Sequence, residues 1–170
     1  MLSNTEPRQQ VALALGSNLG ASRATLEAAL AALDQSADVR LLARSSWYRS
    51  APIGPVQPDY LNGCAVLEVG LAPEALLDLL QATEQRFGRV RAERWGPRSL
   101  DLDLIFYGQL LLRSERLQIP HPHMAERGFV LLPLAEIAPT WIDPHSGRSV
   151  RELAAALADP GGVERLAGAW

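Results

Sequence analysis

Residues 94–103 constrain the fold of this chain more than any other stretch of it. Polar and apolar residues alternate from Ser99 onward, so Asp101 and Asp103 would share one face of a β-strand, with leucines on the other. Asp is a poor strand former, so two aspartates in a strand interior need an explanation. Carboxylates two residues apart lie roughly 6.5–7 Å apart along a strand, and they can converge on two divalent cations about 3.5–4 Å apart.

Arginines cluster immediately before these aspartates, around a turn formed by Gly96 and Pro97. Carboxylates for Mg²⁺ beside arginines for phosphate oxygens are typical of phosphoryl-type transfer. The Asp pair alone would be explained more simply as the acidic outer face of a half-exposed strand. The arginines favour the functional interpretation, and their mutual repulsion predicts a lid that closes over anionic substrates. They are Arg89, Arg91, Arg94 and Arg98.

Length and composition indicate one globular domain, with residues 1–9 as a disordered tail and residues 10–170 as the domain. The net charge of −3 argues against a general nucleic-acid binder, because affinity for phosphate backbones needs a basic surface. Cys64 is the only cysteine, which excludes an internal disulfide and favours a reducing compartment. Without a long apolar run or a signal-like start, the sequence predicts a cytoplasmic protein that does not enter membranes.

Hydrophobic patterns along the chain predict the order strand, helix, strand, strand, helix, strand. This order is typical of a ferredoxin-like βαββαβ sandwich, an α+β fold. A turn at Gly108 begins a C-terminal extension with a short hairpin and a helix over the sheet; residues 129–137 are interpreted as apolar packing and residues 161–170 as loosely docked. The six elements are expected at residues 11–15, from Ser22, and at 39–48, 62–69, 73–88 and 99–106.

Several polar segments leave two interpretations open. Residues 16–20 could present backbone N–H groups to an anion, or form a plain strand-to-helix turn. The proline-rich residues 50–60 could approach a site, or act as a spacer. Glu84, at the edge of a helix stripe, could point into the site or form a boundary ion pair. His121 and His123 lack a third zinc ligand nearby, so an imidazole that reaches a phosphate oxygen is the better functional hypothesis.

Taken in order, the segments resemble one family, the 6-hydroxymethyl-7,8-dihydropterin pyrophosphokinases of folate biosynthesis. The resemblance covers about residues 11–140, and its most specific part is Arg-Trp-Gly-Pro-Arg-x-Leu-Asp-Leu-Asp. It implies a ferredoxin-like fold, ATP as co-substrate, two Mg²⁺ ions, and transfer of a diphosphate to the pterin hydroxymethyl group with release of AMP. The other matching segments are residues 16–19, 45–49, 57–62, 119–123 and 127–129.

The same resemblance implies roles for individual residues. Asp101 and Asp103 match the metal ligands and, with Arg89 and Arg98, the catalytic set. Trp95 matches one of two aromatic rings that sandwich the pterin. The positions matched to ATP binding are Gln81, Glu84, Arg89, Arg98, Arg116, His121 and Arg127, with Arg94 in support. The positions matched to pterin binding are Ser50, Ile53, Tyr60, Asn62, Trp95 and Phe129.

Two rival classes of function are weaker. An RNA-binding module on such a sheet would need exposed aromatic residues on the central strands and a basic face, which the predicted strands lack. A non-catalytic nucleotide-binding regulator would have little need of the Asp101 and Asp103 pair. We therefore expect small-molecule substrates, no nucleic-acid or membrane partner, and a monomer.

Overall fold

The computed structural model describes residues 7–18, 22–51, 56–88, 99–157 and 162–166. Its main sheet has the strand order β5-β1-β4-β3-β8, and β2 also pairs with β4. All pairings among these strands are antiparallel. The strands are β1 (Gln9–Ser17), β2 (Val39–Arg44), β3 (Tyr48–Ser50), β4 (Tyr60–Val69), β5 (Asp101–Tyr107) and β8 (Glu164–Arg165).

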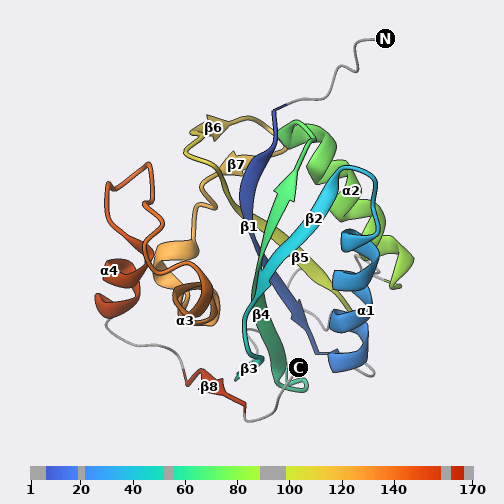
Figure 1. Cartoon of the computed structure of the whole chain (residues 1–170). Coiled ribbons are helices and arrows are strands. Elements are labelled where there is room, and N and C mark those ends of the chain that lie inside the picture. Colours follow the sequence, from blue (N-terminus) through green and yellow to red (C-terminus); the bar gives the residue numbers. More distant parts are fainter. Residues whose placement is uncertain (1–6, 19–21, 52–55, 89–98, 158–161, 167–170) are drawn as a thin grey trace.

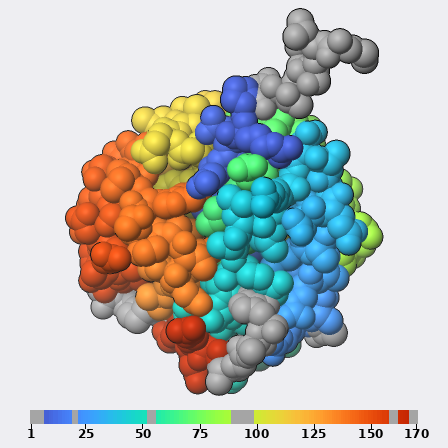
Figure 2. Space-filling view, viewed as in Figure 1, coloured from blue at the N-terminus to red at the C-terminus, as the bar shows by residue number. Residues whose placement is uncertain are grey.

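Helices cover both faces of this sheet (Figure 1). Helices α1 (Ser22–Asp34) and α2 (Pro73–Arg86) pack on the face that receives Val11, Leu13 and Leu15 of β1. Helix α3 (Gly128–Ile137) covers the face of Ala12 and Ala14, and α4 (Val150–Ala155) packs on α3. Figure 2 shows the α3 and α4 region in orange on the side opposite the blue α1. Because both faces of β1 are buried, its sequence reads as a continuous apolar run.

The predicted helices and the C-terminal hairpin are present. Leu26, Leu30 and Leu33 form the buried stripe of α1, which begins at Ser22 itself. Pro73 is the first residue of α2, and Gly88 follows its end with φ +83°, a conformation that glycine adopts without strain. The hairpin consists of β6 (Leu112–Arg113) and β7 (Gln118–Ile119), and a 3-10 helix, η1 (Met124–Glu126), leads into α3.

The single strand expected over residues 39–48 is divided into β2 and β3. The backbone pairing with β4 is interrupted between them, where the Trp47 side chain packs on β4. A Cβ added to Gly63 would lie 2.6 Å from Cζ3 of Trp47, so the indole ring rests against a position that has no side chain. Ser45 preserves contact across the gap: its N–H donates to the Cys64 carbonyl at 2.9 Å, and its Oγ accepts from the Cys64 N–H at 2.9 Å.

Three further expectations differ from the structure. Residues 129–137 are helical; Glu136 is the one charged residue in an otherwise apolar segment that contains Pro133, so the sequence shows no polar face with a helical period. Helix α4 packs on α3 rather than directly over the sheet. Residues 162–166, expected to dock loosely, contribute β8, which pairs with β3.

The division into a tail and a domain stays a prediction; β1 begins at Gln9, and residues 1–6 are outside the described ranges. Among the described residues, no helix has the length and apolar character needed to cross a membrane.

Candidate active site

One row of residues runs across the sheet at the C-terminal end of β1. Gly16 of β1 lies opposite Asp101 of β5 on one side and opposite Asn62 of β4 on the other. Tyr48 of β3 continues the row beyond Asn62. Since neighbouring strands are about 4.7–4.9 Å apart, the Cα atoms of Asp101 and Asn62 are roughly 10 Å apart. The register therefore brings the predicted metal ligand and the predicted pterin contact to one place.

Gly16, in the middle of this row, lets other side chains come close to the β1 backbone. A Cβ at this position would lie 3.2 Å from Oδ1 of Asn62 and 3.6 Å from Cδ1 of Tyr60. A glycine inside a strand often marks a place where another group approaches the backbone closely. The row thus has the candidate side chains of Asp101 and Asn62, with no side chain between them.

The two aspartates lie as the alternation predicted. Asp101 is partly exposed and Asp103 exposed, while Leu100, Leu102 and Leu104 are buried. Mg²⁺ is usually bound in proteins by one or two carboxylates, with substrate phosphates and water completing its octahedron. Over the described ranges, no group of three or more His, Cys, Asp or Glu side chains could hold a metal ion. The donor chemistry of Asp101 and Asp103 fits a metal that arrives with a phosphorylated substrate.

Glu84 of α2 contacts the backbone of Leu102, the residue between these aspartates, at the outer edge of the sheet. Its side chain is buried, and Oε2 accepts a hydrogen bond of 2.9 Å from the backbone N–H of Leu102. Strand β5 ends the strand order, so this N–H would otherwise be an unpaired edge donor. Burial and this bond place the Glu84 carboxylate against β5, and its assignment to the site stays a prediction. Gln81, three residues earlier on α2, is half-buried.

His121 lies beside the same strand, because its backbone N–H donates to the Ile105 carbonyl at 3.1 Å. Burial, with the positive charges of Arg127 and His123, lowers the pKa of His121 to about 4. The ring is therefore neutral at pH 7. Its Nδ1 accepts from the His123 backbone N–H at 3.2 Å, which leaves the ring proton on Nε2. His121 can thus donate a hydrogen bond to an anion without carrying a charge.

The start of α3 supplies an aromatic ring and a cation. The guanidinium carbon of Arg127 lies 5.5 Å from the centroid of the half-buried Phe129 ring. A cation at this distance from an aromatic face is weakly attracted to it. The contact holds Arg127 close to the helix start, where the sequence expected a nucleotide contact.

Two buried polar residues form the other side of the site. Nδ2 of Asn62 donates to Oγ of Ser50 at 2.6 Å, and both side chains are at most 5 % exposed. Tyr60, opposite Ser50 in the ladder, is half-buried. A buried amide fixed by a hydroxyl presents its remaining groups in one orientation, as recognition of a polar ring edge requires.

Arg116 is the one described candidate that the structure does not bring to this place. It forms ion pairs with Glu74 at 3.0 Å and Asp78 at 2.6 Å, near the start of α2. Glu74 and Glu84 are separated by about 15 Å along the helix axis. Four other candidates, Ile53, Arg89, Trp95 and Arg98, and the supporting Arg94, fall outside the described residues, as does the expected lid.

Sequence reasoning missed two features of the site. The first is the position of Gly16 within β1, which was interpreted as part of a turn. The second is Asn18, whose Nδ2 donates to Oε1 of Gln57 at 2.8 Å and to the Pro58 carbonyl at 3.0 Å. These bonds tie the end of β1 to residues 57 and 58 of the proline-rich segment, which favours the interpretation that this segment approaches the site. Gly inside a run of strand residues was the available signal for the first feature.

Two carboxylates and a fixed amide on one sheet face, with a neutral imidazole donor beside β5, define a site suited to phosphoryl-type transfer to a polar acceptor. Comparison with known proteins agrees. A sequence model of the family described as 7,8-dihydro-6-hydroxymethylpterin-pyrophosphokinase (HPPK) matches residues 12–139. The chain belongs to this family. It is therefore an ATP-dependent diphosphotransferase of folate biosynthesis, acting on hydroxymethyldihydropterin.

Individual relatives carry the same name, 2-amino-4-hydroxy-6-hydroxymethyldihydropteridine pyrophosphokinase. The protein of Synechocystis sp. is 55% identical over 139 residues, covering 82% of this chain and 71% of its own. That of Pseudomonas aeruginosa is 51% identical over 162 residues, covering 95% and 99%. A solved Plasmodium falciparum HPPK-DHPS with pteroate shares the fold at TM-score 0.70 and 12% identity. This chain covers 44% of that longer chain, and 90% of this chain is matched.

Proposed function

We propose that Asp101, Gly16 and Asn62 form the centre of the active site of this diphosphotransferase. The hydroxymethyl oxygen of the pterin forms a bond to the β-phosphorus of ATP, and the bond between that phosphorus and the α-phosphate oxygen breaks. AMP leaves, and the hydroxyl proton passes to solvent. The observation that carries this proposal is the ladder register, which gives Asp101 and Asn62 a common neighbour without a side chain.

Asp101 and Asp103 would hold two Mg²⁺ ions. When bound, such ions neutralise phosphate charge and lower the pKa of a nearby hydroxyl group. The chain's own contribution is two carboxylates whose strand is anchored by Glu84 at the intervening Leu102. That anchor limits the freedom of the pair, and fixed ligand geometry is what orientation of a phosphate chain needs.

The ATP phosphates and the rest of the nucleotide would be bound by residues on both sides of β5. His121 donates through Nε2 to a phosphate oxygen, and Arg127 adds a positive charge from the start of α3. Gln81 and Glu84 border the nucleotide from α2. Arg89 and Arg98 are assigned to the transferred group, where arginines stabilise developing charge. Arg116 joins them only by leaving its ion pairs with α2.

The pterin would lie against the Asn62 side of the row. Asn62 and the backbone of Ser50 and Ile53 read its polar edge, while Phe129 and Trp95 stack on its two faces and Tyr60 packs nearby. Support comes from the Asn62 to Ser50 hydrogen bond, which holds the amide in one orientation. A site built to hydrogen-bond a substrate rejects analogues that leave those groups unpaired.

The finer structural assignments are also proposals. The strand order β5-β1-β4 followed by β2 and β3, with α1 and α2 on one face, supports a ferredoxin-like classification. We further propose that the chain acts as a monomer in the cytoplasm, on small molecules and without a nucleic-acid or membrane partner.

The test distinguishes the Asp101 side of the row from the Asn62 side by the kinetic parameter that each substitution changes. Asp101→Asn should reduce kcat by several orders of magnitude, since metal ions supply several kcal/mol of charge stabilisation in such sites. Asn62→Ala should raise the KM for the pterin about tenfold or more while the KM for ATP stays near the wild-type value. Glu115→Gln, an exposed carboxylate in the hairpin loop, is the matched control.

Nucleotide chromatography after turnover gives the second readout. AMP should accumulate in step with the pterin diphosphate. Near-normal Mg²⁺-dependent turnover by Asp101→Asn, or ADP as the main nucleotide product, would contradict the proposed site and reaction.

A further inference from the structure

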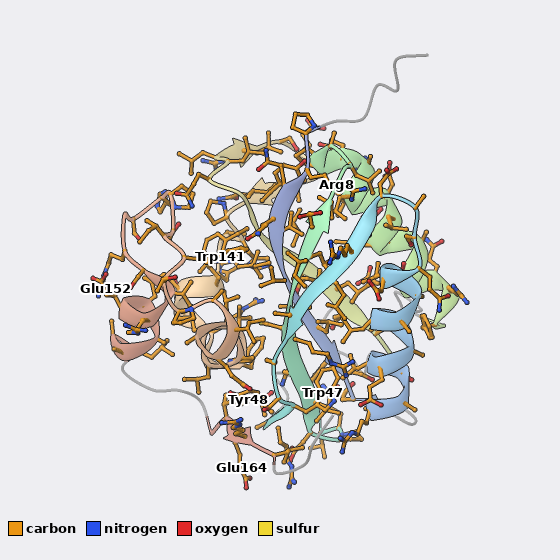
Figure 3. The ribbon with its side chains drawn as sticks, viewed as in Figure 1. Arg8, Trp47, Tyr48, Trp141, Glu152 and Glu164 are labelled. Atoms are coloured by element: carbon orange, nitrogen blue, oxygen red, sulfur yellow. The ribbon has the colours of Figure 1, made fainter. Side chains whose placement is uncertain are left out.

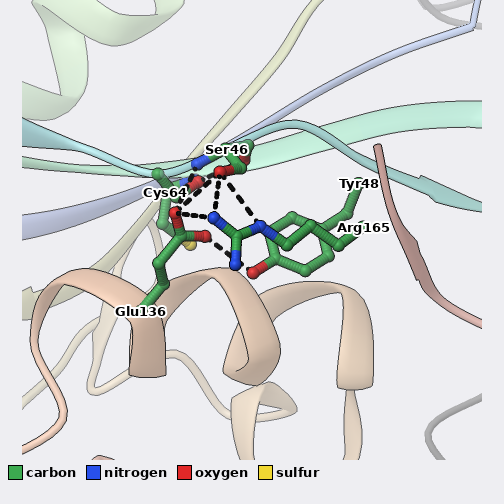
Figure 4. A network of polar contacts seen from close by, with 6 residues as sticks. Ser46, Tyr48, Cys64, Glu136 and Arg165 are labelled. Atoms are coloured by element: carbon green, nitrogen blue, oxygen red, sulfur yellow. Dashed lines mark hydrogen bonds and ion pairs between the residues drawn. The ribbon is translucent and has the colours of Figure 1, made fainter. Parts of the chain in front are cut away.

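A polar cluster on the α3 side of β3 has no part in the reaction described above. It consists of Ser46, Tyr48, Glu136 and Arg165, and we refer to it as the Glu136 cluster (Figure 4). Its members come from the segment before β3, from β3, from α3 and from β8. A group of residues so far apart in sequence holds separate elements in one arrangement.

Glu136 is the acceptor that unites the cluster. Oε1 accepts from the backbone N–H of Ser46 at 3.0 Å and from its Oγ at 2.8 Å, and Oε2 accepts from the hydroxyl of Tyr48 at 2.7 Å. Burial alone would raise the pKa of Glu136, but these hydrogen bonds and the charge of Arg165 lower it instead. The carboxylate is thus ionised at neutral pH and binds both ends of the segment that contains Trp47.

Arg165 completes the cluster from β8, which pairs with the edge of β3 opposite to β4. Its Nε and Nη2 donate to Oγ of Ser46 at 3.2 and 3.0 Å, and Nη2 lies 3.4 Å from Oε1 of Glu136. In the ladder, Arg165 lies opposite Tyr48, and the N–H of Leu166 donates to the Trp47 carbonyl at 2.9 Å. Figure 3 shows Tyr48 and Trp47 at the same end of the sheet as Glu164 of β8.

The cluster connects directly to the proposed pterin side. Tyr48 lies opposite Asn62 in the ladder, and Ser50, two residues further along β3, accepts the Asn62 hydrogen bond. Strand β3 has only three residues, so its own backbone pairing with β4 provides few hydrogen bonds. Its position therefore depends on contacts from outside the sheet, and Glu136 supplies them.

We propose that Glu136 is a positioning residue for pterin binding and that Arg165, from the C-terminal segment, supports it. This inference rests on the proposed assignment of Asn62 and Ser50 to the pterin. It gives a function to a segment beyond residues 12–139, the part that matches the family model. Glu136 fixes Tyr48 and Ser46, these fix β3, and β3 fixes the Ser50 hydroxyl against the Asn62 amide.

The two residues should differ in the size of their effect. Arg165 is 63% exposed at its side chain, so Arg165→Ala should raise the KM for the pterin only about two- to fivefold. Glu136→Gln replaces one acceptor oxygen with a donor that faces Tyr48 or Ser46, and it should raise that KM about tenfold. Neither substitution should change kcat or the KM for ATP by more than about twofold, because neither residue contacts the proposed phosphate groups.

The experiment measures both KM values, kcat and the thermal midpoint for the full chain and four variants. Besides Glu136→Gln and Arg165→Ala, these are Arg165→Lys, which keeps the charge but loses the planar fork, and Glu164→Ala. Glu164 is exposed on the same two-residue strand and serves as the matched control. Arg165→Lys should fall between wild type and Arg165→Ala, and Glu164→Ala should match wild type.

The outcomes distinguish failure of this inference from failure of the site assignment. A purely structural role would lower the thermal midpoint and the active fraction without changing the KM for the pterin, and that result overturns the inference. So does a parallel rise in both KM values. If Asn62→Ala itself leaves the pterin KM unchanged, the assignment of the pterin side is what fails. Should Glu136→Gln not fold, Arg165→Ala and Arg165→Lys still decide the question.

Discussion

At the scale of the residue, the environment of each side chain decides its chemistry more than its type does. His121 is the clearest case, because burial and the charge of Arg127 lower the pKa of its ring, and the His123 backbone N–H occupies its Nδ1. Gly16 is the converse, a residue whose contribution is the space it leaves. Arg116, although chemically suited to a phosphate, is engaged by two carboxylates of α2.

The pKa of His121 predicts a stability that depends on pH. Its folded pKa of about 4 lies below the ordinary histidine value of 6.5, so the unfolded chain binds more protons between these values. The contribution of His121 is fully present above about pH 6.5 and is lost as pH falls through about 4. It amounts to at most about 3 kcal/mol, and less where solvent reaches the ring.

This contribution can be measured with His121→Gln, which remains neutral throughout. Chemical denaturation from pH 7 to pH 4 should show a smaller loss of unfolding free energy for the variant than for the wild type. His145→Gln, at an exposed histidine that is not among the charged neighbours of His121, is the control. Equal pH slopes in wild type and His121→Gln would mean that the ring titrates normally.

Gly16→Ala tests whether the close approach of Asn62 to the β1 backbone matters for binding. The new methyl group would lie 3.2 Å from Oδ1 of Asn62, closer than ordinary van der Waals contact, and would displace that amide. We expect a rise of about tenfold or more in the KM for the pterin, with a stability loss at the low end of the about 1–3 kcal/mol that overpacking costs. Steady-state kinetics and thermal denaturation check the two parts, and an unchanged pterin KM would exclude Gly16 from the site.

At the scale of the element, short strands and exposed segments are held by side chains from elsewhere. Strand β3 depends on Trp47 packing on Gly63 and on the Glu136 cluster. The hairpin of β6 and β7 is joined to α2 through Arg116, and Ser114 also contacts Glu74 at 3.4 Å. The edge of β5 is paired by Glu84 and His121.

Gly63→Ala should lower the free energy of unfolding and leave the KM for the pterin largely unchanged. The added Cβ would lie 2.6 Å from Cζ3 and 2.7 Å from Cε3 of Trp47, so the indole ring or the strand must shift. Overpacking of this kind costs about 1–3 kcal/mol. Urea denaturation should show that loss, and it should exceed the loss expected for Gly16→Ala. Equal stability of Gly63→Ala and wild type would disprove the close packing.

The ion pairs of Arg116 with α2 predict that removing one of them raises the affinity for the nucleotide. If Arg116 must leave Asp78 to reach a phosphate, Asp78→Asn should lower the KM for ATP by up to about fivefold, since exposed pairs contribute at most about 1 kcal/mol. The effect should shrink as salt increases. Titration with a non-hydrolysable ATP analogue measures it, and unchanged affinity would leave Arg116 as a link between hairpin and helix only.

At the scale of the whole molecule, the centre of the sheet is the most stable part. Strands β1 and β4 are buried on both faces and paired on both sides, whereas β8 and the β6–β7 hairpin have two residues per strand. Hydrogen exchange should therefore find the slowest amides in β1 and β4, opening only with global unfolding. The amides of β8 should exchange faster, and slow exchange there would show that the C-terminal segment belongs to the central cooperative unit.

The sequence by itself determined the elements with regular periods and the chemistry of the site. The alternation around Asp101, the stripe of Leu26, Leu30 and Leu33, and the run from Val11 to Leu15 each follow a period that depends only on neighbours in the chain. The resemblance of residues 94–103 to one family likewise needed no contacts. The sequence therefore predicted the reaction class and the strands β1, β4 and β5 of the main sheet.

Only the tertiary structure decided which side chains meet. The partner of Gly16 across each ladder, the burial that lowers the pKa of His121, and the capture of Arg116 by α2 depend on groups far away in sequence. The same holds for α3, whose apolar sequence has no polar face to reveal a helix, and for β8, whose two residues gain a partner only when β3 lies beside them. Register, burial and electrostatic environment are properties of the packed chain, because each is set by distances between residues that a linear pattern does not contain.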